Sequence, residues 1–129
     1  MMTTNDTSLT AALGRAQFGR LTTFRRNGQA VSTPIWFADR GGKAVFVTGP
    51  RTGKAKRMRR SPQVKVGRAT ARGKLKGQEV NGTARLLSGD EAIEARNLLL
   101  AKYGVQFRVL QLIQLITRAT PVYYEVSAA

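Results

Sequence analysis

Seven Lys or Arg side chains lie in the segment TGPRTGKAKRMRRSPQVKV, residues 48–66, which contains no acidic residue. Lys54, Arg57 and Arg60 follow one another at intervals of three, which places them on one face of a helix. Arg51 and Thr52 come just before it, where free backbone N–H groups and the helix dipole favour an anion. We therefore predict a phosphate or carboxylate site, because a few charge-assisted hydrogen bonds suffice for micromolar binding.

The run GPRTGK is similar to a Walker A loop, but its spacing excludes that motif. Gly49 and Gly53 are separated by three residues where the motif needs four. Ala55 also follows the lysine, at the place of the Ser or Thr that binds magnesium. The segment is therefore not predicted to be a nucleotide-binding P-loop.

The positive charge has no acidic counterpart nearby. The chain of 129 residues has 22 Lys plus Arg and 7 Asp plus Glu, a formal net charge of +15, and residues 40–78 hold 13 of the bases and no acid. Such a surface repels itself unless anions bind to it. One alternative is an ordinary solvated basic face, and another is a nucleic-acid interface, for which a high pI is typical. Nucleic acid is disfavoured because the segment has no aromatic residues for base stacking and the chain has no helix-turn-helix or zinc-finger pattern.

The sequence contains no histidine and no cysteine. This excludes a Ser-His-Asp triad, a Cys-His pair, disulfides, and metal sites built on either residue. We predict no catalytic side chain and no metal site. No segment has the length of a membrane span or the pattern of a signal peptide, so we expect a cytoplasmic protein without membrane contact.

Short strands and turns predict the elements that position the basic segment. Asn27-Gly28 is the strongest hairpin signal, and Gly41-Gly42 marks a second tight turn. Gly82 lies inside a strand pattern and is predicted to mark a bulge. The predicted strands span 18–26, 29–39, 43–49, 63–71, 79–87 and 120–128, and the predicted helices span 8–17, 54–60, 89–104 and 105–117.

These elements predict one domain over residues 8–129, after a flexible tail at 1–7. The first five strands follow one another as a meander, apart from one inserted helix, and predict an antiparallel barrel with helical additions. The helix at 105–117 is apolar on nearly every side but is too short to cross a bilayer. We expect it to be nearly buried all round, covering the barrel or lining a dimer interface.

Three segments carry a family resemblance: FGRLTTFRRNGQAVSTPIWFAD, VFVTGPRTGKAKRMRRSPQVKV, and GQEVNGTARLL followed by two helices and a last strand. Together they resemble the pyridoxamine 5'-phosphate oxidase-like split-barrel superfamily, and within it small actinobacterial proteins described as F420-dependent enzymes. The resemblance covers residues 18–126, and its most specific part is Thr52, Lys54, Pro62 and Val64. It implies a mainly β (α+β) fold, a six-stranded antiparallel split β-barrel with short helices, in a homodimer with a flavin or deazaflavin at the subunit interface.

The resemblance also implies roles for single residues. Lys54 would be the main phosphate ligand, Thr52 a hydroxyl donor, and Arg57 and Arg60, near Arg51, contacts to the phosphate or to an acidic cofactor tail. The cofactor ring would lie on two neighbouring strands, although Trp36 can equally be a core or interface aromatic residue and Thr33 an edge-strand feature. The residues predicted to form this ring bed are Thr33, Pro34, Trp36, Val47 and Thr48.

The predicted function is an F420-dependent oxidoreductase that transfers hydride to a small unsaturated substrate. A chain without His or Cys can support this chemistry, because a hydride carrier brings its own reactive carbon. F420 is favoured over FMN because an acid-free basic run suits a polyanionic tail better than it suits a single phosphate. The alternatives are an FMN-binding protein, a carrier without turnover, and a basic nucleic-acid binder. The sequence does not place Arg15, Arg20, Arg25 and Arg26 relative to the basic segment.

Overall fold

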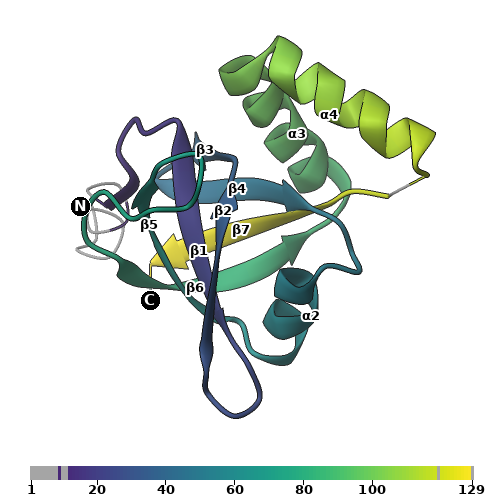
Figure 1. Cartoon of the computed structure of the whole chain (residues 1–129). Helices are drawn as coiled ribbons and strands as arrows, with labels where there is room; N and C mark the ends of the chain where they lie inside the picture. The colour runs from purple at the N-terminus through teal and green to yellow at the C-terminus, as the bar shows by residue number, and fades with distance from the viewer. Residues whose placement is uncertain (1–8, 10–11, 119, 129) are drawn as a thin grey trace.

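A strongly curved antiparallel sheet forms the centre of the fold, and two helices, Gly89–Tyr103 and Val105–Ile116, pack on its outside (Figure 1). The computed structural model describes residue 9, residues 12–118 and residues 120–128. Within them, the seven strands are β1 (Phe18–Phe24), β2 (Ala30–Ile35), β3 (Phe37–Arg40), β4 (Lys43–Thr48), β5 (Gln63–Ala69), β6 (Val80–Leu87) and β7 (Val122–Ala128). The helices with defined bounds are α2 (Gly53–Arg60), α3 (Gly89–Tyr103) and α4 (Val105–Ile116).

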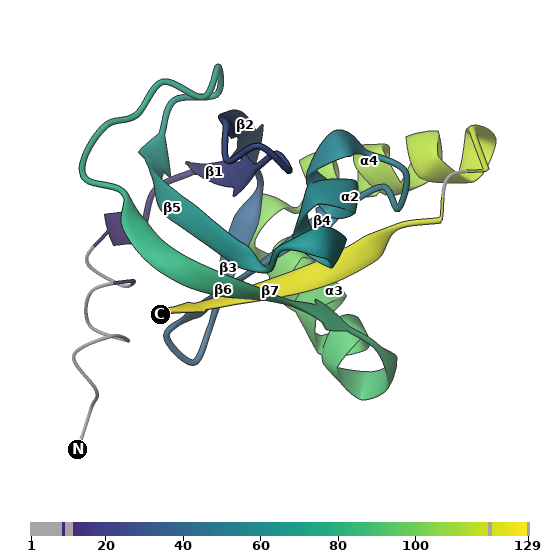
Figure 2. The same ribbon diagram turned by 90° about the horizontal axis from the view of Figure 1, so that it is seen from below.

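The strand order corrects the predicted topology. It is β2-β1-β5-β6-β7-β4-β3, so the sheet has seven strands rather than six and its two edges, β2 and β3, leave it open. A simple meander through the first five strands is also wrong. The chain leaves β4 through α2 and crosses to β5, which pairs with β1, while β4 pairs with the final strand β7 (Figure 2). The antiparallel, sheet-dominated α+β fold is confirmed.

The seventh strand arises because the predicted strand at 29–39 is broken at Trp36. The backbone N–H of Phe37 donates to the hydroxyl of Tyr103 at 2.9 Å, on α3. The two halves then pair with different neighbours, β2 with β1 and β3 with β4. A hydroxyl from a distant helix thus replaces a strand partner at the break, which no local pattern in the sequence encodes.

The hairpin between β1 and β2 is confirmed at Asn27-Gly28. Gly28 has φ +89, a left-handed conformation that glycine adopts at little cost. Its N–H donates to the carbonyl of Arg25 at 2.8 Å, and the Asn27 side chain accepts from the N–H of Gln29 at 2.9 Å. The loop therefore closes as the sequence predicts.

Gly82 has a different role from the predicted bulge. The register of β6 is regular against both neighbours, with Gly82 opposite Val64 on one side and Ala128 on the other. A Cβ at this position would lie 2.6 Å from the side chain of Val126. Glycine is needed here because two strands and a packed side chain approach closely.

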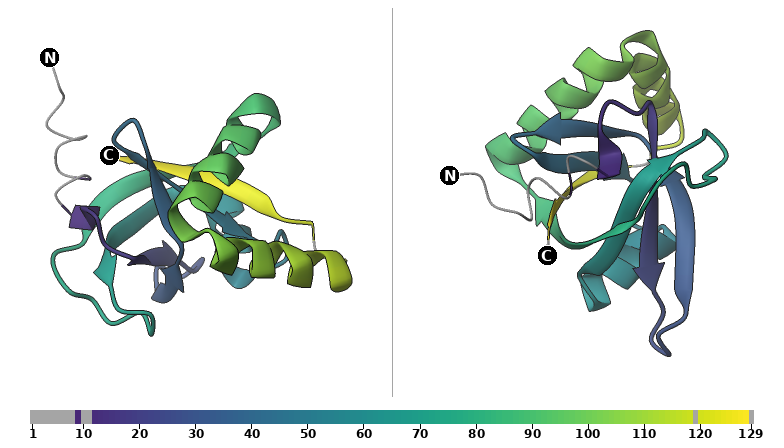
Figure 3. Two further views of the ribbon diagram at one scale, coloured as in Figure 1. Left: turned by 90° about the horizontal axis from the view of Figure 1, so that it is seen from above. Right: turned by 90° about the vertical axis from the view of Figure 1, so that its left-hand side faces the viewer.

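Two apolar cores lie on opposite faces of the sheet. The first fills the inside of the curve and includes Leu21, Phe46 and Met58 of α2. The second lies between the sheet and the helices α3 and α4 and includes Leu99 and Phe107 (Figure 3). Because Met58 belongs to the first core, α2 is anchored and its polar face has a fixed position.

Helix α4 is far less buried than predicted. Phe107 is fully buried against the second core, but Val105, Leu115 and Ile116 are 72–76% exposed. The expectation of burial on nearly every side is therefore wrong for the single chain, because α4 packs mainly along one side on α3 (Figure 1). Among the helices that the structure describes, none combines the length and apolar character needed to cross a bilayer.

The first described residues belong to a short helical segment. Leu9, Ala12 and Leu13 are helical and buried, and Gly14 has φ +54, so the helix ends at Leu13 rather than at Gln17. The predicted tail at residues 1–7, and part of the helix predicted to begin at Ser8, lie outside the described residues. Lys102 on α3 fixes the chain after this helix by donating to the carbonyl of Ala16 at 2.9 Å.

Candidate functional site

The N-terminus of α2 is built by the hydroxyl of Thr52. This oxygen accepts a hydrogen bond from the N–H of Ala55 at 3.2 Å, donates to the carbonyl of Gly49 at 3.0 Å, and lies 3.0 Å from the hydroxyl of Thr48. Such N-caps start helices because they pair backbone groups that have no partner inside the helix. Thr52 and Thr48, both predicted site residues, are therefore in direct contact. The role of Thr52 as a ligand donor stays a prediction.

The basic face of α2 points towards the end of β1. Arg57 donates from Nε to Oγ1 of Thr23 at 2.6 Å, and Arg60 donates to the carbonyl of Phe24. Lys54 is half-buried one turn before and has no hydrogen-bond or ion-pair partner among the described residues. The predicted alignment of these three side chains is confirmed, since Ala55 and Met58 on the other side are buried.

The acidic side chains of the described residues leave this face uncompensated. Their ion pairs involve three arginines only, Arg20, Arg40 and Arg85, none of which belongs to α2. Burial, and after it the charge of Arg57, lowers the pKa of Lys54 below its usual 10.5. The lowered pKa reflects burial of the amine beside another cation, and an anion bound here would favour the charged form.

Two arginines of β1 and its hairpin can now be placed. Arg25 lies near enough to Arg57 to contribute, after burial, to lowering the pKa of that guanidinium. Arg20 instead pairs with Glu79, from Nε to Oε2 at 3.4 Å. Arg25 therefore belongs with the cations of α2 and Arg20 does not. We call Arg25, Lys54, Arg57 and Arg60 the cationic cluster.

The predicted ring-bed residues of β2 lie beside this cluster. Thr33 stands opposite Leu21, two register positions from the pair of Val31 with Thr23, so Thr33 and Thr23 share one face of the sheet. The hydroxyl oxygen of Thr33 is buried and has no hydrogen-bond partner among the described residues. A buried unpaired hydroxyl is costly, and a polar ligand atom would relieve that cost. The exposed Pro34 faces the opposite way and contacts Gly73, whose missing Cβ would lie 3.3 Å from its ring.

The other ring-bed residues are divided between the two sides of the sheet. Trp36 stacks on Tyr103, with ring centroids 4.8 Å apart, and packs with Val47 against the second core. Thr48 is buried next to Thr52. The structure thus brings Thr48 to the start of α2, whereas Trp36 acts in the chain as a packing residue against α3.

Tyr103 and Lys102 form a polar junction on the opposite side from α2. Burial raises the pKa of Tyr103 to about 12, and its hydroxyl donates to the carbonyl of Gln17 at 2.7 Å. Burial lowers the pKa of Lys102 to about 8, and its amine donates to the carbonyl of Phe37 at 2.6 Å. Both groups bond to backbone carbonyls, which makes this junction structural.

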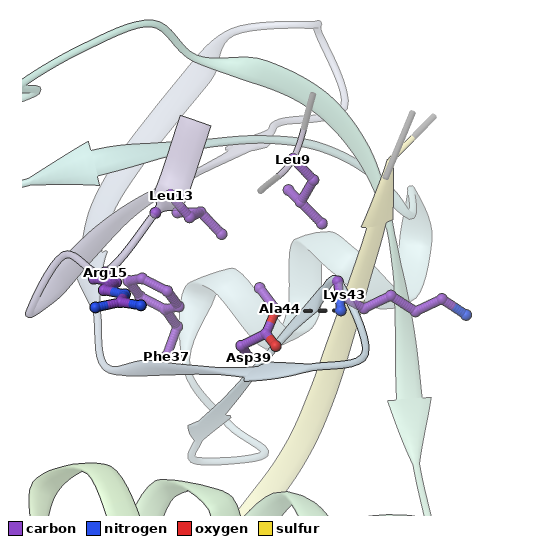
Figure 4. Close-up of a pocket in the computed structure, with 9 residues that line it drawn as sticks. Leu9, Leu13, Arg15, Phe37, Asp39, Lys43 and Ala44 are labelled. Carbon is purple, nitrogen blue, oxygen red and sulfur yellow. Dashed lines mark hydrogen bonds between the residues drawn. The ribbon is translucent and has the colours of Figure 1, made fainter. Parts of the chain in front are cut away.

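Two cavities lined by described residues bear on the position of the site. The larger, of about 530 Å³, lies between Leu9, Leu13 and the β3–β4 hairpin, where Asp39 accepts from the N–H of Gly42 at 3.2 Å (Figure 4). It contains none of the predicted cofactor residues. The other, of about 500 Å³, adjoins the start of α2 and contains both Arg51 and Thr52. We call this second cavity the α2 groove. No group of three or more metal-ligating side chains was found in the described part of the chain.

Sequence reasoning missed three contributors to this region. Thr23 is 1% exposed and binds Arg57 across 34 positions, a contact that only the packing of α2 on β1 creates. Arg25 was not placed, although its position just before the Asn27-Gly28 turn could have suggested it. Arg118 enters the α2 groove from the connection after α4, and its sequence neighbourhood carries no signal for this.

Comparison with known proteins places this geometry in a family. The pyridoxamine 5'-phosphate oxidase family matches residues 6–121, most of the chain. A comparison with curated proteins gives no match.

Solved structures of several kinds share the fold. A conserved hypothetical protein from Mycobacterium tuberculosis aligns with a TM-score of 0.69 at 20% identity, covering 99% of this chain and 81% of that one. HutZ, the heme storage protein from Vibrio cholerae, aligns with a TM-score of 0.68 at 11% identity. The alignment covers 95% of this chain and 87% of that one. An F420-H2 dependent reductase aligns with a TM-score of 0.64 at 18% identity, covering 86% of this chain and 93% of that one. At these identities the likeness concerns the fold, and the ligands differ between the neighbours.

The match over residues 6–121 and the open, seven-stranded antiparallel sheet agree with each other. The chain belongs to the pyridoxamine 5'-phosphate oxidase family, with the split-barrel fold of that superfamily.

Proposed function

We propose that this protein is an oxidoreductase that binds the deazaflavin F420 through the cationic cluster. The observation that supports the proposal is the cluster itself: four cations at the end of β1 and on α2, with no carboxylate partner among the described residues. One fold neighbour is an F420-H2 dependent reductase, which agrees with this choice of cofactor.

The residues present fit a phosphate-bearing ring cofactor. Lys54 and Arg57 would hold the phosphate, with Arg57 oriented by Thr23. The unpaired hydroxyl of Thr33 would meet a polar edge of the ring. In the full proposed site, Arg51, Thr52 and Arg60 complete the phosphate end, and Pro34, Trp36, Val47 and Thr48 complete the ring bed.

The bound cofactor would supply the hydride, so the chain needs to bind, orient and shield rather than to react. Tyr103 and Tyr123 are unsuited to releasing a proton at neutral pH, since burial raises the pKa of both. A small unsaturated molecule remains the substrate class that we propose. The task of the protein residues is therefore electrostatic and geometric.

We further propose that the active form is a homodimer, with the exposed apolar face of α4 at or near the contact between the two copies. Six large aliphatic side chains on this helix are 50–76% exposed, a contiguous kind of surface that monomers rarely leave in water. They are Val105, Val109, Leu112, Ile113, Leu115 and Ile116.

The test is a fluorescence titration of the protein with F420 and, separately, with FMN. Lys54→Ala should weaken F420 binding at least about tenfold, because it removes a charge-assisted hydrogen bond of about 1.5–3 kcal/mol. Lys56→Ala is the matched control: it makes the same change on the same helix, at an exposed position without a side-chain partner among the described residues. Equal affinities of the two variants would refute the proposed site.

The same titrations separate the remaining alternatives. Tighter binding of FMN would favour an FMN protein. Tight F420 binding without hydride transfer to any of a broad panel of enones and quinones would favour a carrier. If neither cofactor binds, while duplex DNA binds with an affinity that falls steeply with salt, the basic surface serves nucleic acid instead.

A further inference from the structure

The connection from β5 to β6 carries a second concentration of positive charge, apart from α2. Residues 68–78 contain four Lys or Arg side chains and no acidic residue. All four are exposed, and none forms an ion pair with a described residue. We call residues 68–78 the basic arm, and its cations are Arg68, Arg72, Lys74 and Lys76.

Backbone hydrogen bonds make the basic arm a defined hairpin. The N–H of Thr70 donates to the carbonyl of Lys74 at 2.9 Å, and the N–H of Lys76 donates to the carbonyl of Arg68 at 2.8 Å. Between these two bonds, Gly73 turns the chain with a φ of +86. Its N–H donates to the carbonyl of Thr70 at 2.9 Å. The exposed cations are therefore carried by an ordered backbone.

The basic arm is also packed on the sheet. Leu75 lies over Gly67 of β5, where a Cβ would come within 2.7 Å of the leucine side chain. Successive side chains of an extended segment point to opposite sides. Because Leu75 is half-buried against the sheet, Lys74 and Lys76 on either side of it turn outward, and both are exposed.

Two cations of the arm stand directly opposite each other. The bond from the N–H of Lys76 to the carbonyl of Arg68, and the adjacent bridge between Ala69 and Leu75, make Arg68 and Lys76 a cross-strand pair. Like charges in such a pair are destabilising. Gly77 leaves room for the guanidinium of Arg68, since a Cβ there would lie 3.0 Å from it. An anion bound between the two side chains would relieve their repulsion.

The acidic residue that follows the arm is already committed elsewhere. One carboxylate oxygen of Glu79 lies 3.4 Å from Nε of Arg20 and accepts a hydrogen bond from the hydroxyl of Thr22 at 2.8 Å. Both partners belong to β1, so the carboxylate is held there. The four charges of the arm therefore stay uncompensated within the described part of the chain.

The basic arm is separate from the proposed cofactor site. β5 begins just after α2 and ends at the arm, and its seven residues span about 20 Å. The arm and α2 accordingly lie at opposite ends of this strand (Figures 1 and 2). A phosphate held by the cationic cluster would thus leave the arm unpaired, so the arm needs an anion of its own.

The composition of the arm favours one class of partner. It has no aromatic residue, and its one large aliphatic side chain, Leu75, packs on the sheet. Protein interfaces depend on apolar or aromatic anchors, and attachment to a membrane surface needs apolar side chains that enter the lipid. Single-stranded nucleic acid needs aromatic residues on which bases stack. Duplex nucleic acid, in contrast, is bound through its phosphates by charge alone.

We infer that the basic arm binds the phosphate backbone of duplex nucleic acid, independently of the base sequence. Lys74 and Lys76 lie two residues apart on one strand of the arm, and Arg68 lies opposite Lys76 on the other. These three cations share one face and would neutralise successive phosphates, while Arg72 extends the contact from the turn. This inference does not depend on the proposed function, because the cationic cluster takes no part in it.

The test measures the fluorescence anisotropy of labelled duplexes about two helical turns long, one of DNA and one of RNA, with the full-length protein. The arm variant, Lys74→Gln with Lys76→Gln, removes two positive charges. The matched control, Arg96→Gln with Arg108→Gln, removes two charges from exposed positions on α3 and α4. Thermal unfolding checks that each variant is folded, and the arm variant should unfold no earlier than the wild type because it loses a like-charge pair.

The wild type should bind the duplexes, and the logarithm of its affinity should fall linearly with the logarithm of the salt concentration. The arm variant should bind about tenfold or more weakly at about 0.1 M salt, and its slope should be smaller by about 1.8, as expected for two lost phosphate contacts. The control variant should keep the slope of the wild type. Binding of only one of the two duplexes would support the inference and identify the source of the phosphates.

Four results would overturn the inference. The first is a wild type that binds neither duplex at low salt. The second is an equal loss in the arm variant and the control, which would mean that net charge alone attracts the duplex. The third is an arm variant that loses affinity for F420 as well, which would assign the arm to the cofactor. The fourth is a loss of binding to anionic lipid vesicles or to polyglutamate, with duplex binding unchanged, which would assign the arm to another class of partner.

Discussion

Nε of Arg57 donates a hydrogen bond to Oγ1 of Thr23 at 2.6 Å, from the middle of α2 to the penultimate residue of β1. Thr23 is 1% exposed, so its hydroxyl has a fixed position. The bond therefore orients the guanidinium group within a cluster whose members repel one another. In the proposed site, this contact would hold Arg57 ready to bind an anion.

The first prediction follows from this contact. Thr23→Val keeps the shape of the side chain and removes the hydroxyl, so F420 affinity should fall about threefold to tenfold, within the range of one hydrogen bond. The free energy of unfolding should fall by about 1 kcal/mol. Thr83→Val is the control, because it makes the same change at a half-buried threonine of β6, and it should leave the F420 affinity unchanged. A Thr23→Val protein that binds like the wild type would show that Arg57 needs no such positioning.

The second prediction concerns pH and Lys54. Burial and Arg57 lower the pKa of Lys54 below 10.5, and a bound anion would raise it again, so binding should be linked to proton uptake. Affinity for F420 should therefore fall as pH rises through the lowered pKa, at a pH below 10.5. Lys54→Arg should bind with less pH dependence, because arginine keeps its proton throughout. Titrations between about pH 7 and about pH 10 measure this, and parallel curves for the two proteins would contradict it.

The third prediction concerns Glu125, which is 1% exposed and bonded to both Arg40 and Arg85. Burial would raise the pKa of this carboxyl, but the hydrogen bonds from Arg85 and Arg40 outweigh it and lower the pKa below 4.5. Its contribution to stability is therefore present above the unfolded pKa and is lost as pH falls through the lower, folded value.

Glu125→Gln should reduce the free energy of unfolding by about 3 kcal/mol at neutral pH, because Arg40 and Arg85 each lose the one carboxylate partner that is buried. Chemical denaturation at neutral and acidic pH measures this. Glu94→Gln removes another partner of Arg40, but its side chain is 55% exposed, so a much smaller loss is expected. Equal effects of the two substitutions would mean that burial does not matter at Glu125.

The fourth prediction concerns Lys102, whose pKa burial lowers to about 8. Between pH 8 and the unfolded value of 10.5, the unfolded chain binds more protons at this position than the folded one. The free energy of unfolding should therefore rise with pH across this range, and Lys102→Met should lack that part of the rise. Lys56→Met is the control, because Lys56 is exposed, and its free energy of unfolding should change with pH as in the wild type. The slopes come from denaturation curves at several pH values, and a slope unchanged in Lys102→Met would contradict the assignment.

The fifth prediction tests the proposed homodimer. Leu112→Glu and Ile116→Glu place a charge on the apolar face of α4 and should shift sedimentation equilibrium from dimer to monomer. Ile93→Glu is the control, since Ile93 is 47% exposed on α3, outside this face. A wild type that sediments as a monomer at every concentration would remove this proposal, and dimers that persist in both α4 variants would place the contact elsewhere.

Much of the candidate site could be predicted from the sequence because it is local. Thr52 starts α2, and Ala55 and Met58 turn inward from it. These features depend on a helix cap and on a spacing of three or four residues. Both are local patterns that involve only a few neighbouring positions of the chain. The turn at Asn27-Gly28 was predictable for the same reason, since the conformation belongs to the two residues themselves.

Pairings between distant segments were decided by the tertiary structure. The split at Trp36 depends on a hydroxyl of α3, the bond from Arg57 depends on how α2 lies on β1, and Arg118 reaches the α2 groove because β4 pairs with β7. The sequence by itself determined the charge, the helix that carries most of it, and the lack of histidine and cysteine. Which cations gather and which are neutralised followed only from long-range strand pairing, because that pairing is selected by the packing of the whole core and not by any single segment.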